Sequence, residues 1–80
     1  MFWCIYIIEC SDGKLYTGIT NNLKRRIKEH NNGSGCKFTR CRIPVTLRYN
    51  KRVNSRSVAS KEEARIKGLP RSKKIELIKK

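Results

Sequence analysis

The sequence predicts an α+β fold in which helices flank a three-stranded, mostly antiparallel sheet, in the order β-β-α-β-α-α. Two β-branched and aromatic segments near the N-terminus are separated by a glycine-containing turn, which is typical of a β-hairpin. An alternation of apolar and polar residues follows a proline in the middle of the chain and predicts the third strand. Elsewhere, apolar residues recur at helical spacing. The 80 residues are enough for one domain, residues 1–80, with one small core.

The hairpin is predicted over residues 2–9 and 15–20. Residues 2–9 are rich in isoleucine and aromatic residues, which favour strands. The polar segment 11–14 between the two strands contains Gly13, which we expect at positive φ. The two segments are therefore expected to pair directly, joined by a tight turn.

The turn type decides where two tyrosines lie. A two-residue turn over 12–13 would place Tyr6 and Tyr16 on opposite faces of the sheet. A three-residue loop over 12–14 would place both on one face, but four residues apart along the strand, or roughly 13 Å. By spacing alone, two ordinary sheet aromatics explain these tyrosines better than a shared site does.

The first helix is predicted directly after the hairpin. The asparagines at 21–22 can cap its N-terminus, and Leu23 and Ile27 form the start of an apolar stripe that continues to about Asn32. Residues 36–42 follow, and their basic, unpatterned composition predicts a loop.

The second half of the chain contains the third strand and two more helices. Pro44 fits only the start of a strand, and alternation continues over 45–50. A polar loop is expected over 51–55, a helix over 57–67, and a short last helix after Pro70.

The composition is strongly basic. Twenty Lys and Arg against six Asp and Glu give a net charge of +14 and a pI near 10.3. Self-repulsion of this size favours a polyanionic partner. No apolar run approaches the roughly 18 residues of a membrane span, and no signal peptide is recognisable, so we expect a cytoplasmic protein without a membrane partner.

Arg26 and the only histidine, His30, are candidate catalytic residues. They lie four residues apart on one face of the predicted helix, beside its apolar stripe. A guanidinium can hold a phosphate, and an imidazole can assist proton transfer near neutral pH. An ordinary basic helix surface with a half-buried histidine explains the same pair.

Glu62 and Glu63 are candidate metal ligands on the helix predicted over 57–67. A helical wheel places Glu62 near the centre of the apolar stripe and Glu63 at its edge. One carboxylate can hold Mg²⁺ whose remaining ligands are water and a phosphate. Alternatively, Ser60 and Glu63 fit a capping box, in which Glu63 would serve only a helix start.

The four cysteines form no recognisable metal motif. Cys4, Cys10, Cys36 and Cys41 include no C-x₂-C pair, so a zinc site with His30 has little support from spacing. In a reducing compartment disulfides are rare, and Cys4 and Cys10 fit better as small core residues.

Taken in order, these residues resemble the GIY-YIG nuclease superfamily, and most closely its small single-domain bacterial YhbQ-like group. Residues 4–6 correspond to the family's Gly-Ile-Tyr motif and residues 16–18 to its Tyr-Ile-Gly motif. Two positions depart from these motifs, because Cys4 replaces the glycine and Thr17 replaces the isoleucine. The family's helix arginine, its partner four residues later and its metal-binding glutamate correspond to Arg26, His30 and Glu63.

The resemblance implies a metal-dependent DNA endonuclease that acts on branched or damaged DNA in repair or recombination. Tyr6 would take a proton from the attacking water, with Tyr16 as the second choice. Arg26 would stabilise the transition state, His30 would hold or activate the tyrosine, and Glu63 would bind Mg²⁺ or Mn²⁺. The DNA backbone would be contacted by Lys37, Thr39 and Arg40, and no small-molecule cofactor is implied.

A nucleic-acid-binding protein of the same fold without catalytic activity is the main alternative. The charge of +14 explains nucleic-acid binding equally well, and it also permits an RNA-binding or ribosome-associated protein. The sequence leaves the oligomeric state open.

Overall fold

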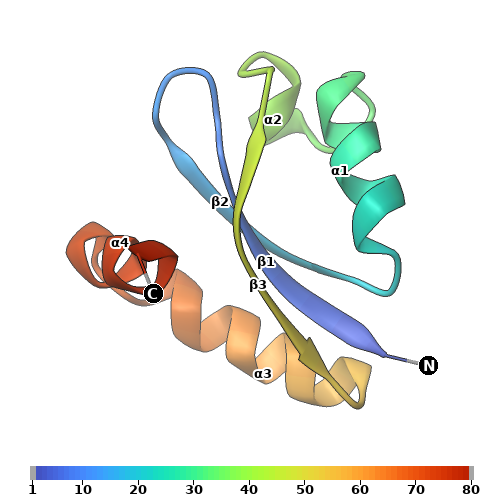
Figure 1. Ribbon diagram of the computed structural model, residues 1–80, viewed down its shortest axis with the longest axis vertical. Helices are drawn as coiled ribbons and strands as arrows, with labels where there is room; N and C mark the ends of the chain where they lie inside the picture. Colours follow the sequence, from blue (N-terminus) through green and yellow to red (C-terminus); the bar gives the residue numbers. More distant parts are fainter. Residues whose placement is uncertain (1, 80) are drawn as a thin grey trace.

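The computed structural model describes residues 2–79, and Figure 1 shows their arrangement. The three strands form one antiparallel sheet in the order β2-β1-β3, so β2 and β3 are its edges. The predicted α+β fold is confirmed. The elements in chain order are β1 (Trp3–Glu9), β2 (Leu15–Thr20), α1 (Leu23–Asn31), α2 (Lys37–Arg40), β3 (Thr46–Val53), α3 (Arg56–Lys67) and α4 (Arg71–Lys79).

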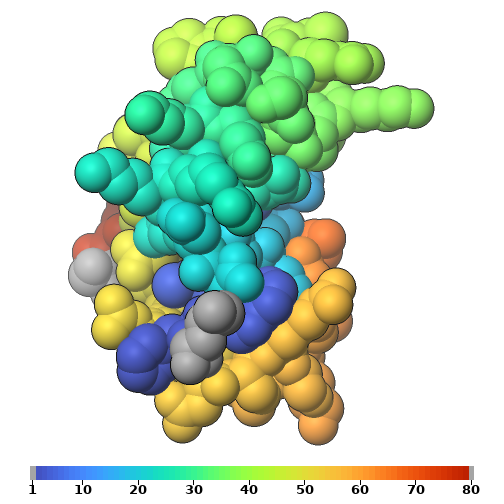
Figure 2. All heavy atoms as spheres, turned by 90° about the vertical axis from the view of Figure 1, so that its right-hand side faces the viewer, coloured from blue at the N-terminus to red at the C-terminus, as the bar shows by residue number. Residues whose placement is uncertain are grey.

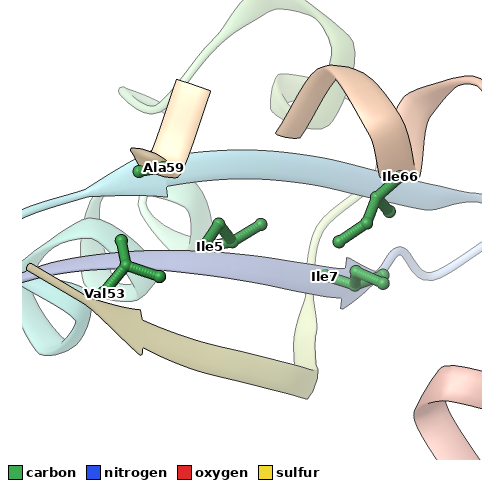
Figure 3. Packing of buried hydrophobic residues seen from close by; sticks show 5 residues of the cluster. All are labelled: Ile5, Ile7, Val53, Ala59 and Ile66. Carbon is green, nitrogen blue, oxygen red and sulfur yellow. The ribbon is translucent and has the colours of Figure 1, made fainter. Parts of the chain in front are cut away.

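Helices cover both faces of the sheet, so the core forms two clusters instead of the one that we predicted. On one face, Ile5 and Ile7 of β1 pack with Val53, Ala59 and Ile66 (Figure 3). On the opposite face, Tyr6 and Ile8 of β1 pack with Cys10 and Val45 and against Leu23 and Ile27 of α1. The long helix α3 and the helix α1 therefore lie on opposite sides of the central strand (Figure 1).

The hairpin register differs from both predicted alternatives. Tyr6 pairs with Gly18 and Ile8 with Tyr16, which places the three-residue loop at 11–13, one position earlier than 12–14. Gly13 has φ +85°, as predicted. This register places Tyr6 and Tyr16 on one face of the sheet. Their offset along the strands is two residues, compared with the four residues predicted for the three-residue loop. The observed pairing therefore brings together two side chains that we expected far apart.

Three element boundaries also differ from the prediction. The segment predicted as a basic loop contains one helical turn, α2, and β3 continues to Val53 through residues predicted as loop. Strand pairing explains the second difference, because residues 51–53 pair with Ile5, Cys4 and Trp3 of β1. The helix α3 begins at Arg56, where the side chain of Ser55 accepts a hydrogen bond from the Val58 N–H. Ser60 lies inside this helix, so the capping box considered for Glu63 does not form.

No helix within residues 2–79 combines the length and apolar character that crossing a membrane requires.

Candidate functional site

Tyr6 and Tyr16 lie side by side on the α1 face of the sheet. Their ring centroids are 6.5 Å apart, although Tyr6 is almost completely buried and Tyr16 only partly. Gly18 makes this possible, because a Cβ atom at Gly18 would lie 2.5 Å from the Tyr6 hydroxyl oxygen. A side chain at position 18 would thus displace the Tyr6 ring, so the glycine positions the phenol across β2.

His30 connects the tyrosines to α1 and α2. It is fully buried, and its Nε2 lies 2.9 Å from the Tyr6 hydroxyl oxygen. Its Nδ1 lies 2.8 Å from Oγ1 of Thr39, a residue that is itself fully buried. Gly35 packs so closely against the His30 ring that a Cβ atom there would collide with Nδ1. The imidazole is therefore held on both nitrogens and on one face.

The hydrogen bonds favour one tautomer of His30. Burial, followed by the charge of Arg26, lowers the pKa of His30, so the ring is neutral at pH 7 and carries one N–H. The Thr39 hydroxyl lies 3.4 Å from both the carbonyl oxygen and the Sγ atom of Cys36, so it can donate to the carbonyl and accept from His30 Nδ1–H. In that arrangement Nε2 accepts the Tyr6 phenolic proton, and His30 is a base directed at Tyr6.

We expect nitrogen NMR of the only histidine to report the Nδ1–H tautomer in the wild-type protein. Thr39→Val, which is nearly isosteric, should either convert His30 to the Nε2–H tautomer or lower the free energy of unfolding by about 1–3 kcal/mol, because a buried N–H would lose its acceptor. Thr39→Ser should retain the wild-type tautomer. An Nε2–H tautomer in the wild-type protein would contradict the assignment.

Arg26 lies at the partly exposed side of this cluster. Its Nη2 donates to the Gly35 carbonyl oxygen at 3.1 Å, and its Nη1 forms an ion pair with Glu29 at 3.2 Å. Burial raises the pKa of Tyr6 above its ordinary value, and the neighbouring Arg26 guanidinium opposes that rise. Burial, followed by the Cys36 side chain, raises the pKa of Tyr16 to about 12. Both tyrosine rings lie beside His30, with centroid distances of 5.8 Å for Tyr6 and 5.5 Å for Tyr16, and the Arg26 charge acts on the pKa of both. The hydrogen bond to His30 Nε2 comes from Tyr6.

Glu62 and Glu63 differ in their surroundings. Glu62 is bound to Lys51 and Arg65, and the Arg65 hydrogen bond is the main reason why the pKa of Glu62 is lowered. Glu63 pairs with Lys67 at 3.4 Å, and its negative charge contributes to the raised pKa of Tyr6. Among the influences on the pKa of Tyr6 that come from burial, Arg26, Cys36 and Glu63, that of Glu63 is the smallest.

The donor set at Glu63 fits a hard divalent cation. One carboxylate oxygen ligand suits Mg²⁺, which retains several waters and dehydrates reluctantly. Within residues 2–79, no three His, Cys, Asp or Glu side chains gather in a group that could hold a metal ion, so the zinc site considered from the cysteines is not formed there. Mg²⁺ or Mn²⁺ bound to Glu63 would displace Lys67 from its ion pair.

Of the three residues predicted to contact the DNA backbone, two are exposed and one is buried. Lys37 and Arg40 are exposed at the two ends of α2. Thr39 is buried, and its hydroxyl binds His30 and the Cys36 carbonyl oxygen, so a phosphate contact does not fit its position. The helical turn of α2 explains the difference, because neighbouring residues on a helix point in different directions.

Sequence reasoning did not identify the contacts of Gly35, Cys36 and Phe38. Gly35, which follows α1 by a few residues, packs on His30. The Cys36 side chain affects the pKa of Tyr16, and the Phe38 ring stacks on Tyr16 with a centroid distance of 5.7 Å. Each contact joins residues more than 4 positions apart, so no local sequence pattern could have revealed it.

Comparisons with known proteins give one consistent family. The family model described as "GIY-YIG catalytic domain" matches residues 2–76. A UPF0213 protein of Halobacterium salinarum is 53% identical over 70 residues, covering 88% of this chain and 91% of its own length. A UPF0213 protein of Streptococcus agalactiae is 48% identical over 75 residues, covering 94% and 85%.

Two solution NMR structures have the same fold. The UPF0213 protein BH0048 from Bacillus halodurans is 42% identical, with a TM-score of 0.64. The protein EF2693 from E. faecalis is 37% identical, with a TM-score of 0.67. Both comparisons cover 99% of this chain and 84% of the other.

Proposed function

This chain belongs to the GIY-YIG catalytic domain family and to its small UPF0213 group, and from this premise we propose that it is a metal-dependent DNA endonuclease. The observation that carries the proposal is that Tyr6, His30 and Arg26 lie together. The Tyr6 hydroxyl is hydrogen-bonded to His30, which can accept its proton, and the Arg26 guanidinium beside them is a cation that could bind a phosphate. The substrate would be branched or damaged DNA in repair or recombination.

In the proposed reaction, Tyr6 receives a proton from the attacking water. Because burial raises the pKa of Tyr6, the phenol is protonated at pH 7 and must lose its own proton in the same step. His30 Nε2, 2.9 Å from the hydroxyl oxygen, is placed to receive it, and the Thr39 hydroxyl holds the ring through Nδ1.

Arg26 and Glu63 would stabilise the negative charge of the reacting phosphate, Arg26 directly and Glu63 through a bound metal ion. The Arg26 guanidinium would stabilise the charge that develops on the pentavalent phosphorus, and Gly35 and Glu29 hold it in place. Glu63 would hold Mg²⁺ or Mn²⁺, and the bound ion would supply charge stabilisation at the leaving oxygen. Lys37 and Arg40 would contact the DNA backbone without reading sequence.

Cleavage of supercoiled and branched DNA tests the proposal. The purified protein with Mg²⁺ is expected to nick both substrates, EDTA is expected to abolish nicking, and Tyr6→Phe is expected to lower the rate at least about hundredfold. Tyr6→Phe keeps the ring over Gly18 and removes only the hydroxyl. DNA binding without cleavage, or cleavage at the wild-type rate by Tyr6→Phe, would favour the non-catalytic nucleic-acid-binding protein instead.

A further inference from the structure

The edge strand β2 is bordered by two basic clefts, one at each end. The first cleft, about 250 Å³, lies at the start of the strand and is lined by Lys14, Leu15, Phe38, Arg71 and Lys74. The second, about 290 Å³, lies at its end and is lined by Ile19, Thr20 and Asn21 with Trp3, Arg25, Arg26, Glu29 and Arg56. Gly18, over which the Tyr6 hydroxyl lies, is between them.

The first cleft is not explained by the catalytic cluster. Its three cations come from the hairpin turn and from α4, and no acidic residue lines it. Within residues 2–79, neither Lys14 nor Lys74 forms an ion pair with a carboxylate. The Arg71 side chain donates to the Gly13 carbonyl oxygen at 3.0 Å, which ties α4 to the hairpin and fixes the wall of the cleft.

The first cleft is continuous with the tyrosines through Phe38. The Phe38 ring stacks on Tyr16 and carries Arg42 at 4.4 Å from its centre, so the ring is fixed in position while 37% of the residue stays exposed. A cleft with a cationic wall and an aromatic rim matches a nucleotide, whose phosphate is anionic and whose base is apolar on its face.

The second cleft contains Arg26, so it reaches the catalytic cluster from the opposite direction. The side view of Figure 2 looks onto α1 (teal to green), above the N-terminal residues (dark blue) and the start of α3 (yellow to orange). The cleft is lined by residues from both helix layers, because Arg25 lies on α1 and Arg56 on α3.

We propose that one DNA strand runs along the β2 edge, with its backbone held by Lys14, Arg71 and Lys74 on one side of the scissile phosphate and by Arg25 and Arg56 on the other. The six residues of β2 span about 17 Å at roughly 3.4 Å each. That length matches about five nucleotides at 3.4 Å per nucleotide in a stacked strand. Leu15, in the first cleft, lies three residues before Gly18, so the cleft beside α4 is a binding subsite for nucleotides about three positions from the cleaved bond.

This inference rests on the proposed function for the position of the scissile phosphate. The path of the strand itself can be tested by DNA binding alone, so the experiment is done without metal. The probe is a fluorescein-labelled oligothymidylate of about 12 nucleotides, titrated in EDTA between 50 and 200 mM salt. Lys14→Ala/Lys74→Ala removes two cations of the first cleft that have no ion pair. Lys24→Ala/Lys28→Ala changes two exposed lysines of α1 that line neither cleft, so it removes the same charge and is the matched control.

The Lys14/Lys74 pair is expected to reduce the slope of log K against log salt by about 1.4, because each phosphate contact on a single strand contributes about 0.7. The control pair should leave the slope at the wild-type value. Equal effects of the two pairs, or none from Lys14/Lys74, would overturn the proposed path. These binding measurements do not depend on cleavage. Absence of nuclease activity would therefore refute the proposed function and leave the proposed DNA path along β2 unaffected.

Discussion

Arg26→Ala is expected to lower DNA cleavage about 100- to 1000-fold while DNA affinity stays nearly unchanged. The reason is that Arg26 is directed at the buried tyrosine cluster, where a cation stabilises charge that develops only in the transition state. In binding it is one of 20 Lys and Arg residues, so at most one phosphate contact is lost. Single-turnover nicking and anisotropy titration measure the two effects separately.

Arg25→Ala is the matched control for Arg26. Arg25 is the preceding residue on α1 and also pairs with Glu29, at 3.8 Å, but its side chain is 65% exposed and makes no contact with Gly35. We expect Arg25→Ala to weaken binding slightly and to leave the single-turnover rate of bound substrate near the wild-type value. Equal loss of that rate in both variants would mean that the charge of the α1 surface, and not the position of Arg26, is required.

Glu63→Ala is expected to remove metal-dependent cleavage altogether. Its carboxylate is the metal ligand in the proposed site, and within residues 2–79 no group of three His, Cys, Asp or Glu side chains could hold the ion instead. DNA affinity measured without metal should hold or rise, because a negative charge near the bound strand is removed. Cleavage should not recover when the Mg²⁺ or Mn²⁺ concentration is raised.

Glu62→Ala is the control that separates the two neighbouring carboxylates. It removes surface ion pairs with Lys51 and Arg65, each worth about 0–1 kcal/mol, so stability should fall only slightly. Its cleavage rate should stay near the wild-type value. Loss of cleavage in Glu62→Ala with normal cleavage in Glu63→Ala would move the metal ligand by one residue.

Much of the fold was predictable because local chemistry determines it. β-branched segments, the glycine turn and the amphipathic spacing of α1 correctly indicated the hairpin and the first helix. The prediction was wrong over residues 51–53 because that segment is polar, and its pairing with β1 makes it a strand. The helical turn at α2 was missed for a similar reason, since four residues carry too little periodicity to recognise.

The chain alone indicated the order of the strands and of every helix except α2, the basic charge, and the candidate residues Tyr6, Tyr16, Arg26, His30 and Glu63. How these residues meet depends on the packing of distant segments. A shift of one position in the hairpin loop brings the tyrosine rings to 6.5 Å, and the packing of α2 against α1 buries Thr39 beside His30. Side-chain type is a local property of the chain, whereas hydrogen-bond partners and burial arise between segments far apart in sequence. The hydrogen bonds of His30 and the clefts beside β2 therefore exist only in the assembled sheet with its two helix layers.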